Sequence, residues 1–455
     1  MRILSITAGA AGMYCGSCTR DNALARELMA LGHDVTLLPV YTPTRPDEAN
    51  VSRPRVLFGG ISVYLQQYAP MFRKAPPWLD RLWDAPGVIS AFASRALSTD
   101  GRMLGDLTVS MLQGEHGALR REFDKLVDWI RAEPLPDVIN LPNTLLIAMA
   151  GPLKREFNRP VCCTMQGEEF FLDSLVPPYR DQALALIREQ VLHVDRFIAV
   201  GDYCAAFMSD YLEIPRERVS VVPLGINMDG YPESSPAASR PEGEPLRIGY
   251  FARIAPEKGL HVLADAYIGL RRRTGRLPIR LETAGYLARS ERAYFDGVCK
   301  TLDGAGLAHE CTHHGEVSRE GKLAYLQRLD VLSVPTTFDE PKGMFVLEAM
   351  ASGVPVVQPR RGGFTEIVER TGGGLLVERD DTDALTEGLQ TLVGDAALRV
   401  SLADRAFHGV REHHGIAESA ARLLDVFASV VVPGESAANT AANTVANTEA
   451  SSSVA

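Results

Sequence analysis

The sequence has no hydrophobic run long enough to cross a membrane, although 46% of its 455 residues are hydrophobic. A membrane-spanning helix needs roughly 18–20 consecutive apolar residues. The first stretch, MRILSITAGAAG, is too short an apolar run for a secretory signal and predicts a strand. We therefore expect a cytoplasmic protein. The stretch FRKAPPWLDRLW (72–83) combines aromatic and basic residues, so peripheral membrane contact stays open beside simple packing on the first domain.

Basic residues and cysteines are also scarce. The 47 Lys and Arg are outnumbered by 57 Asp and Glu, which gives a formal charge of −10 and argues against nucleic acid as a partner. Phosphate ligands remain compatible with this charge, because a few local cations and backbone amides suffice to bind them. The seven cysteines are scattered and odd in number, so a disulfide framework is not expected.

The length predicts at least two hydrophobic cores. Short β-rich runs alternate with helical stretches in both halves, which predicts parallel sheets. We expect an N-terminal Rossmann-like domain at 1–228, a Pro- and Ser-rich linker at 229–244 and a second Rossmann-like domain at 245–415. A helix at about 416–432 is expected to pack back on the first domain. The low-complexity tail at 433–455 is expected to be disordered.

Two stretches in the second half contain the candidate chemistry. In GYFARIAPEKGL, Arg253 and Lys258 lie in the loop after a strand. In FDEPKGMFVLEAMASGVPVV, Gly343 precedes a run of helix formers, which predicts a helix N-terminus at the carboxyl edge of the sheet. Such a terminus and two cations would hold a diphosphate without a metal. Glu348 lies inside the helix, where it would accept hydrogen bonds from vicinal hydroxyls, and Glu340 precedes it.

The stretch EPKGMFVLEAMASGVPVV resembles the Glu-x7-Glu signature of retaining glycosyltransferases of family 4. ARIAPEKGL resembles the diphosphate loop of that family, and GGFTEIVERTGGGLLVERDD resembles the segment after the signature. GHDVTLL, DRFIAVGDYC and VVPLGIN resemble landmarks of its first domain. The resemblance covers most of the chain outside about 50–130 and the tail. It implies the α/β GT-B fold, in which two facing Rossmann-like domains with parallel sheets enclose an interdomain cleft.

The resemblance also implies a reaction. A sugar would pass from a UDP-, GDP- or ADP-sugar to a carbohydrate, lipid or small-molecule hydroxyl acceptor, with retention at the anomeric carbon and with neither a metal nor another cofactor. In the front-face mechanism proposed for the family, the acceptor arrives on the side from which the diphosphate leaves, and the diphosphate takes the proton. No nucleophile of the enzyme is then required.

Individual roles follow from the same resemblance. Glu340 would contact the transferred sugar and is the catalytic candidate, whereas Glu348 would bind the ribose. The residues expected to bind the diphosphate are Arg253, Lys258, Gly343, Met344 and Phe345.

The first domain departs from the family pattern. Gln166 and Gly167 stand where members often have His and Gly. Gln can bind a sugar hydroxyl but cannot act as a base near pH 7. The role of that His is therefore dispensable here or moves to Glu168 or Glu169. Gln166, Glu168 and Gly12 are the candidates for the acceptor side.

The motif CGSC at 15–18 has three interpretations. A redox pair also sits at strand-to-helix junctions. A zinc site needs about four ligands, and the sequence offers no partner CxxC motif. In the favoured interpretation, Gly16 is the loop glycine that relatives place near the donor diphosphate, and Cys15 and Cys18 line that loop.

Two other functions stay open. One is a nucleotide-sugar epimerase or phosphorylase of the same fold, although the Glu-x7-Glu arrangement favours transfer. The other is a non-catalytic sensor, either of sugar nucleotides or of thiol redox state, which only Gln166 and CGSC support.

Overall fold

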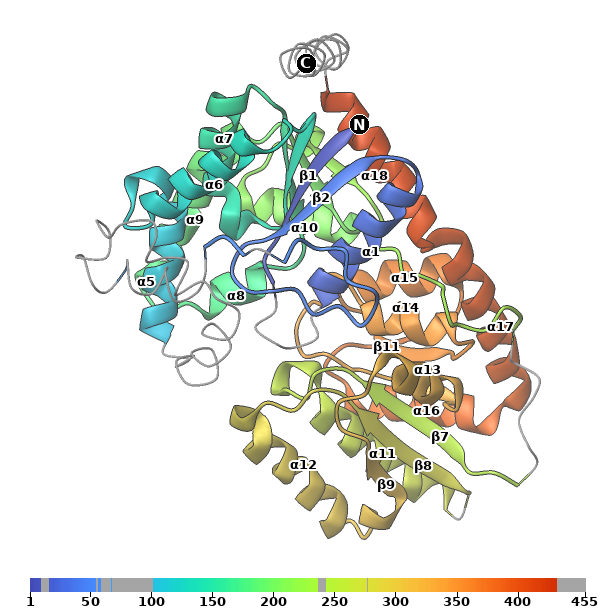
Figure 1. Ribbon diagram of the computed structural model, residues 1–455. Helices are drawn as coiled ribbons and strands as arrows, with labels where there is room; N and C mark the ends of the chain where they lie inside the picture. Colours follow the sequence, from blue (N-terminus) through green and yellow to red (C-terminus); the bar gives the residue numbers. More distant parts are fainter. Residues whose placement is uncertain are drawn as a thin grey trace.

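The computed structural model describes residues 1–9, 16–54, 56–58, 67, 101–235, 243–275 and 277–431. Gly12, Cys15, the 72–83 stretch and the 433–455 tail lie outside the described residues, as does part of the 229–244 linker. Figure 1 shows two α/β halves that meet face to face, the first coloured blue to green and the second yellow to orange.

The first domain contains, within the described residues, a parallel six-stranded sheet in the order β2-β1-β3-β4-β5-β6. Its strands are β1 (Arg2–Thr7), β2 (Asp34–Pro39), β3 (Val138–Leu141), β4 (Val161–Met165), β5 (Arg196–Ala199) and β6 (Val219–Val221). Its helices are α1 (Gly16–Ala30), α5 (Gly101–Leu112), α6 (Arg120–Ala132), α7 (Ala150–Phe157), α8 (Glu169–Ser174), α9 (Tyr179–Gln190) and α10 (Asp202–Leu212). The central strands β3 and β4 are buried along their whole length, as expected where helices cover both faces of a parallel sheet.

The second domain repeats this plan with the strand order β12-β11-β10-β7-β8-β9, again parallel throughout its described part. Its strands are β7 (Leu246–Phe251), β8 (Ile279–Ala284), β9 (Cys311–His313), β10 (Val331–Leu332), β11 (Val356–Pro359) and β12 (Gly374–Val377). Its helices are α11 (Leu260–Thr274), α12 (Arg292–Gly304), α13 (Arg319–Gln327), α14 (Met344–Ala351), α15 (Gly363–Thr371), α16 (Thr382–Gly394) and α17 (Ala396–His413). The predicted fold class of two facing Rossmann-like domains is confirmed.

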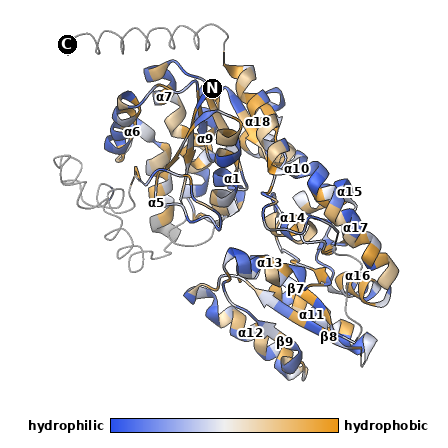
Figure 2. Ribbon diagram, turned by 45° about the vertical axis from the view of Figure 1, so that its right-hand side comes forward, coloured by the Kyte–Doolittle hydropathy of each residue, from blue (hydrophilic) through white to orange (hydrophobic). Residues whose placement is uncertain are grey.

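Helix α18 (Ile416–Val430) leaves the second domain and packs on the first. The ribbon of this helix is largely coloured as hydrophobic in Figure 2. Leu423 and Phe427 of the helix share a buried cluster with Ile3 and Leu24. The chain therefore passes between the domains twice. The two passages run side by side, because the Ile226 amide donates to the His414 carbonyl at 2.9 Å and the Ile416 amide donates to the Ile226 carbonyl at 3.0 Å.

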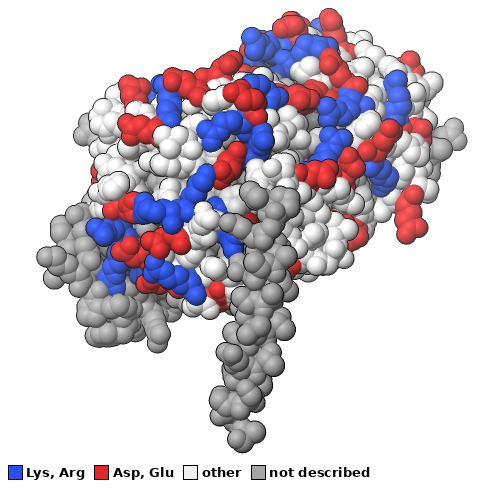
Figure 3. Space-filling model, turned by 90° about the horizontal axis from the view of Figure 1, so that it is seen from above, with Lys and Arg blue, Asp and Glu red and all other residues white. Residues whose placement is uncertain are grey.

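The surface mixes charges of both signs. Lys and Arg side chains alternate with Asp and Glu over the face shown in Figure 3, and neither sign forms one continuous patch there. In the described part of the chain, no helix combines the length and the hydropathy that crossing a membrane requires.

Candidate active site

The loop from β10 to α14 presents the predicted anion site. Gly343 adopts φ 62°, a left-handed conformation that favours glycine, and α14 begins at the next residue. The first amides of this helix have no intrahelical acceptor and point toward the start of the helix. The loop from β7 to α11 packs directly on this segment, since the Thr337 amide donates to the Glu257 carbonyl at 2.9 Å. Two strand ends thus meet at one edge of the second sheet.

Lys258 and Glu340 form a buried ion pair at this edge. The Lys258 ammonium also lies 4.7 Å from the ring centre of Phe338 and 5.8 Å from that of Phe345. Glu340 is only 5% exposed. Burial alone would raise the pKa of its carboxyl, but Lys258 and Lys342 outweigh burial and hold that pKa below its usual value. Glu340 is therefore an ionised carboxylate beside the start of α14.

Arg253 is more exposed than the predicted diphosphate-binding role suggests. It follows β7 at the same edge of the sheet, but its side chain is 47% exposed and bonds Glu257 of its own loop at 2.5 Å. Lys258, by contrast, has most of its side chain buried against the loop before α14. The structure thus brings Lys258, Glu340 and Gly343 together. Arg253 lies at the same edge of the sheet but has almost half of its side chain exposed.

Glu348 lies in α14, and its side chain is buried rather than open to solvent. Its carboxylate accepts a hydrogen bond from the Lys322 ammonium at 2.6 Å, and the same ammonium bonds Asp47 of the first domain. Burial raises the pKa of Glu348, Lys322 opposes that rise and Asp47 adds to it. A cavity of only about 10 Å³ remains beside Glu348 and Met344. In this arrangement of side chains, the cavity is too small to admit a ribose.

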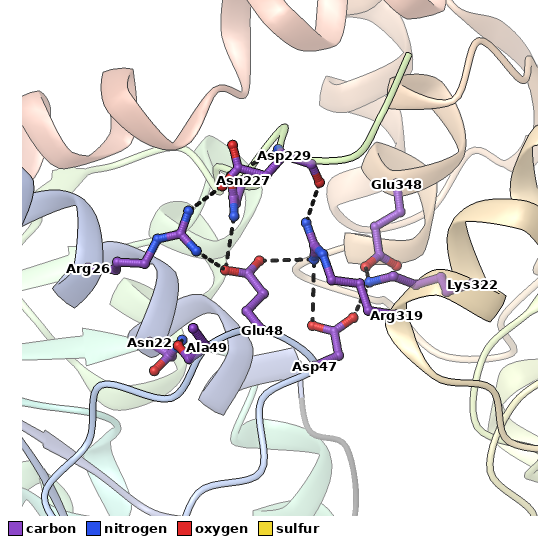
Figure 4. A network of polar contacts seen from close by, with 10 residues as sticks. All are labelled: Asn22, Arg26, Asp47, Glu48, Ala49, Asn227, Asp229, Arg319, Lys322 and Glu348. Carbon is purple, nitrogen blue, oxygen red and sulfur yellow. Dashed lines mark hydrogen bonds and ion pairs between the residues drawn. The ribbon is translucent and has the colours of Figure 1, made fainter. Parts of the chain in front are cut away.

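Lys322 and Asp47 belong to a larger polar network between the domains, which Figure 4 shows. We call it the interdomain clasp and define it as Arg26, Asp47, Glu48, Asn227, Asp229, Arg319 and Lys322. Arg319 of α13 bonds the Glu48 carboxylate at 3.2 Å, and the other oxygen of that carboxylate accepts from Asn227 at 3.1 Å. Asn22 of α1 holds the adjacent loop in place, because it donates to the Ala49 carbonyl at 2.9 Å.

The start of α1 faces the start of α14 across the domain boundary. A methyl group added at Gly16 would lie 3.6 Å from the Met344 sulfur. The Lys342 ammonium donates to the Ser17 hydroxyl at 2.8 Å. Lys342 was not among the residues predicted from the sequence, although a cation directly before Gly343 at a helix start favours an anion site. Cys18 is buried on the same helix, and its predicted neighbour Cys15 is outside the described residues.

The segment after β4 also meets the second domain. Gly167 packs so tightly that an added methyl group would lie 2.4 Å from Pro341, and the rings of Phe170 and Phe338 are 4.7 Å apart. Gln166 and Glu168 both lie in this segment, but their side chains have different hydrogen-bond partners. The Gln166 side chain donates to the Pro142 carbonyl at 2.8 Å. Glu168 accepts hydrogen bonds from the backbone N–H and the hydroxyl of Thr144, both at 2.9 Å, and from the backbone N–H of Gln166 at 2.7 Å. These three contacts hold the Glu168 carboxylate in place.

Glu169, which the sequence offered as the alternative to Glu168, is the less constrained of the two carboxyls. It begins α8 and is 8% exposed. Burial and the neighbouring Glu168 raise its pKa to about 7. Lys342 opposes this rise and Glu340 adds to it, so the 166–169 segment and the anion site lie in one electrostatic environment.

Two family models match the chain. The one described as Glycosyl transferase 4-like domain matches residues 16–225, and the one described as Glycosyl transferases group 1 matches residues 233–408. The D-inositol 3-phosphate glycosyltransferase of Nocardia farcinica is 28% identical over 213 residues, which are 46% of this chain and 47% of that protein. The lipopolysaccharide core biosynthesis mannosyltransferase LpcC of Rhizobium leguminosarum bv. viciae is 27% identical over 249 residues, 53% and 66% of the two chains. These matches span about half to two thirds of each relative's length.

Solved structures share the fold over nearly the whole chain. Sucrose-phosphate synthase from Thermosynechococcus elongatus superposes with a TM-score of 0.68 at 18% identity, over 94% of this chain and 98% of that one. Anabaena HepE in complex with UDP superposes with a TM-score of 0.65 at 16% identity, over 94% and 100% of the two chains. The chain therefore belongs to the glycosyltransferases of the GT-B fold, with a 4-like first domain and a group 1 second domain.

Proposed function

We propose that the protein transfers a sugar from a nucleotide-diphosphate sugar to a hydroxyl acceptor, with retention and without a metal. One observation supports this most strongly. Lys258, Glu340 and the first amides of α14 meet at the carboxyl edge of the second sheet, opposite Ser17 at the start of α1. Ligands of open parallel sheets bind at that edge.

In this proposal, the diphosphate lies at the start of α14. The amides of Gly343, Met344 and Phe345 and the ammonium groups of Lys258 and Lys342 stabilise its negative charge. That charge grows while the bond between the anomeric carbon and the phosphate oxygen breaks, so these contacts strengthen in the transition state. The cations then perform the task that a bound metal performs in other phosphate sites.

The remaining roles concern the sugar and the acceptor. Glu340 accepts hydrogen bonds from the transferred sugar, and Glu348 binds the ribose once Lys322 shares it. The acceptor oxygen forms a new bond to the anomeric carbon on the face that the diphosphate leaves, and its proton passes to the departing diphosphate. The configuration at the anomeric carbon is retained.

The first test is a binding panel. UDP, GDP and ADP, each with and without an attached hexose, are titrated calorimetrically in the presence of EDTA. HepE was solved with UDP and with UDP-glucose, so this pair is tried first. We expect one nucleotide series to bind in EDTA, and Lys258→Met to weaken its affinity at least about tenfold, as expected for a charge-assisted hydrogen bond. Lys300→Met, at an exposed lysine of α12, is the matched control.

Two results would contradict the proposal. Absence of binding to every nucleotide would remove its basis, and binding that requires a divalent cation would remove its metal-free form. An epimerase is distinguished by product analysis, because donor incubated without acceptor would then give the epimeric nucleotide sugar.

A further inference from the structure

Asp47 reaches the second domain from a loop that is tied to the first. The loop follows β2, and Asn22 of α1 holds it, because the Asn22 side chain donates to the Ala49 carbonyl and accepts from the Val51 backbone N–H, both at 2.9 Å. From this loop, the Asp47 carboxylate bonds the Lys322 ammonium of α13, as Figure 4 shows. Asp47 therefore moves with the first domain, and its contact with Lys322 persists only while the two domains stay together.

Lys322 joins Asp47 to the carboxylate that we assign to the ribose. Its ammonium donates to Glu348 at 2.6 Å and also bonds Asp47, and its side chain is only 6% exposed. A buried ammonium needs partners of opposite charge, and this one has a partner in each domain. The three side chains form the Asp47–Lys322–Glu348 bridge, through which a loop of the first domain is connected to α14.

The bridge lies beside a cavity that is nearly closed. The cavity has a volume of about 10 Å³, which leaves room for at most about one water molecule. Its walls come from both domains and include Arg20 and Glu48 of the first and Lys322, Met344 and Glu348 of the second. The approach of the first domain therefore closes the space that a ribose would need beside Glu348.

Asp47 is incompletely satisfied in this contact. Its Oδ2 bonds Lys322, but its Oδ1 is buried and has no hydrogen-bond partner within the described residues. The Arg319 guanidinium lies 3.9 Å from Oδ1, beyond hydrogen-bond distance. A buried acceptor without a donor has lost its hydration without compensation, which offsets part of the attraction between Asp47 and Lys322. Separation of the domains returns this oxygen to water, so the contact is suited to reversible release.

We propose that the Asp47–Lys322–Glu348 bridge is an autoinhibitory contact, which excludes the ribose of the donor until Asp47 withdraws with the first domain; this inference rests on the proposed function. The bridge and the bound donor are mutually exclusive. Lys322 stays paired with Glu348 in both states, and only the contact with Asp47 is given up. Because the apparent affinity is reduced by the fraction of molecules that are competent to bind, removal of Asp47 raises donor affinity without adding a contact to the donor.

The experiment uses the nucleoside diphosphate that binds in the panel, with UDP tried first, and inorganic pyrophosphate, which has no ribose. Both affinities are measured by calorimetry for the wild type, Asp47→Asn and Asp47→Ala. Asp47→Asn removes the charge and keeps the shape, whereas Asp47→Ala removes the whole carboxylate. Asp34→Asn is the matched control, because Asp34 is an exposed carboxylate at the amino end of β2 that pairs with Arg2 at 2.9 Å. Thermal unfolding checks the fold of every variant.

We expect both Asp47 variants to bind the nucleoside diphosphate about three- to tenfold more tightly than the wild type, with pyrophosphate affinity unchanged. Asp34→Asn should match the wild type for both ligands. An equal gain for nucleotide and pyrophosphate would assign the effect to the lost negative charge alone and overturn the inference. Unchanged or weaker nucleotide binding in both Asp47 variants would also overturn it and leave the proposed function standing. Failure of the wild type to bind any nucleotide would instead overturn the proposed function.

Discussion

Glu340 and Lys258 form one buried ion pair, so a substitution of Glu340 also changes the surroundings of Lys258. Glu340→Gln would remove the proposed contact with the sugar, and it would leave Lys258 without its carboxylate partner. The freed ammonium is then available to the diphosphate. We expect Glu340→Gln to lower the transfer rate at least about a hundredfold while diphosphate affinity stays equal or increases. Calorimetry and a rate assay on the same preparation check this, and a parallel loss of both would contradict it.

Glu169 also affects stability. Because its folded pKa of about 7 lies above the unfolded value, its contribution is fully present below about pH 4 and is lost as the pH rises to about 7. This difference corresponds to roughly 3 kcal/mol. We expect the free energy of unfolding of Glu169→Gln to fall less between pH 5 and pH 8 than that of the wild type. Urea unfolding at the two pH values measures it, and identical pH dependence would argue against a raised pKa.

The sequence predicted the positions of some of these residues in the fold but not the contacts of others. Lys258, Gly343 and Glu340 follow strand ends of one sheet, so their convergence follows from topology. The contrast between Glu168 and Glu169 does not, because it depends on Thr144, a residue distant along the chain that occupies one of the two carboxyls. Arg253 shows the same limit: its loop was predictable, but its pairing with Glu257 was not.

At the scale of elements, α18 joins the two halves through its apolar face. Phe427 is 1% exposed in the cluster that also contains Leu24. We expect Phe427→Ala to destabilise the protein by about 3–5 kcal/mol, because it leaves a cavity in a packed core. Urea unfolding measures this loss. Phe295→Ala, at a half-buried ring of α12, is the comparison and should cost less.

The elements that the sequence marked clearly are those with strong local signals. Gly343 before a run of helix formers predicted the start of α14, and the apolar pattern after Gly415 predicted a helix there. Strand length was harder to predict. The apolar stretch VLSVP at 331–335 is one of the β-rich runs of the second half, but it forms a strand only at Val331–Leu332. The chain then continues into the loop that packs on Glu257.

At the scale of the whole molecule, the interdomain clasp links the two domains in the absence of ligand. We expect Lys322→Met to weaken this link, because it leaves Asp47 and Glu348 without their shared cation. Small-angle scattering should then show a larger radius of gyration, and added salt should enlarge the wild type in the same direction. Lys300→Met is again the control, and equal scattering curves for wild type and Lys322→Met would refute the link. No local pattern predicted the clasp, since Lys322 and Asp47 are separated by 275 positions.

The paired passage of the chain at Ile226 and Gly415 restricts how the halves can move. A single connecting peptide swivels freely, whereas two hydrogen-bonded peptides form a ribbon that bends in one direction and resists torsion. We therefore expect any opening of the two domains to be a hinge motion about that ribbon. Each closure about this ribbon would then return Ser17, at the start of α1, to Lys342, just before α14, along the same path.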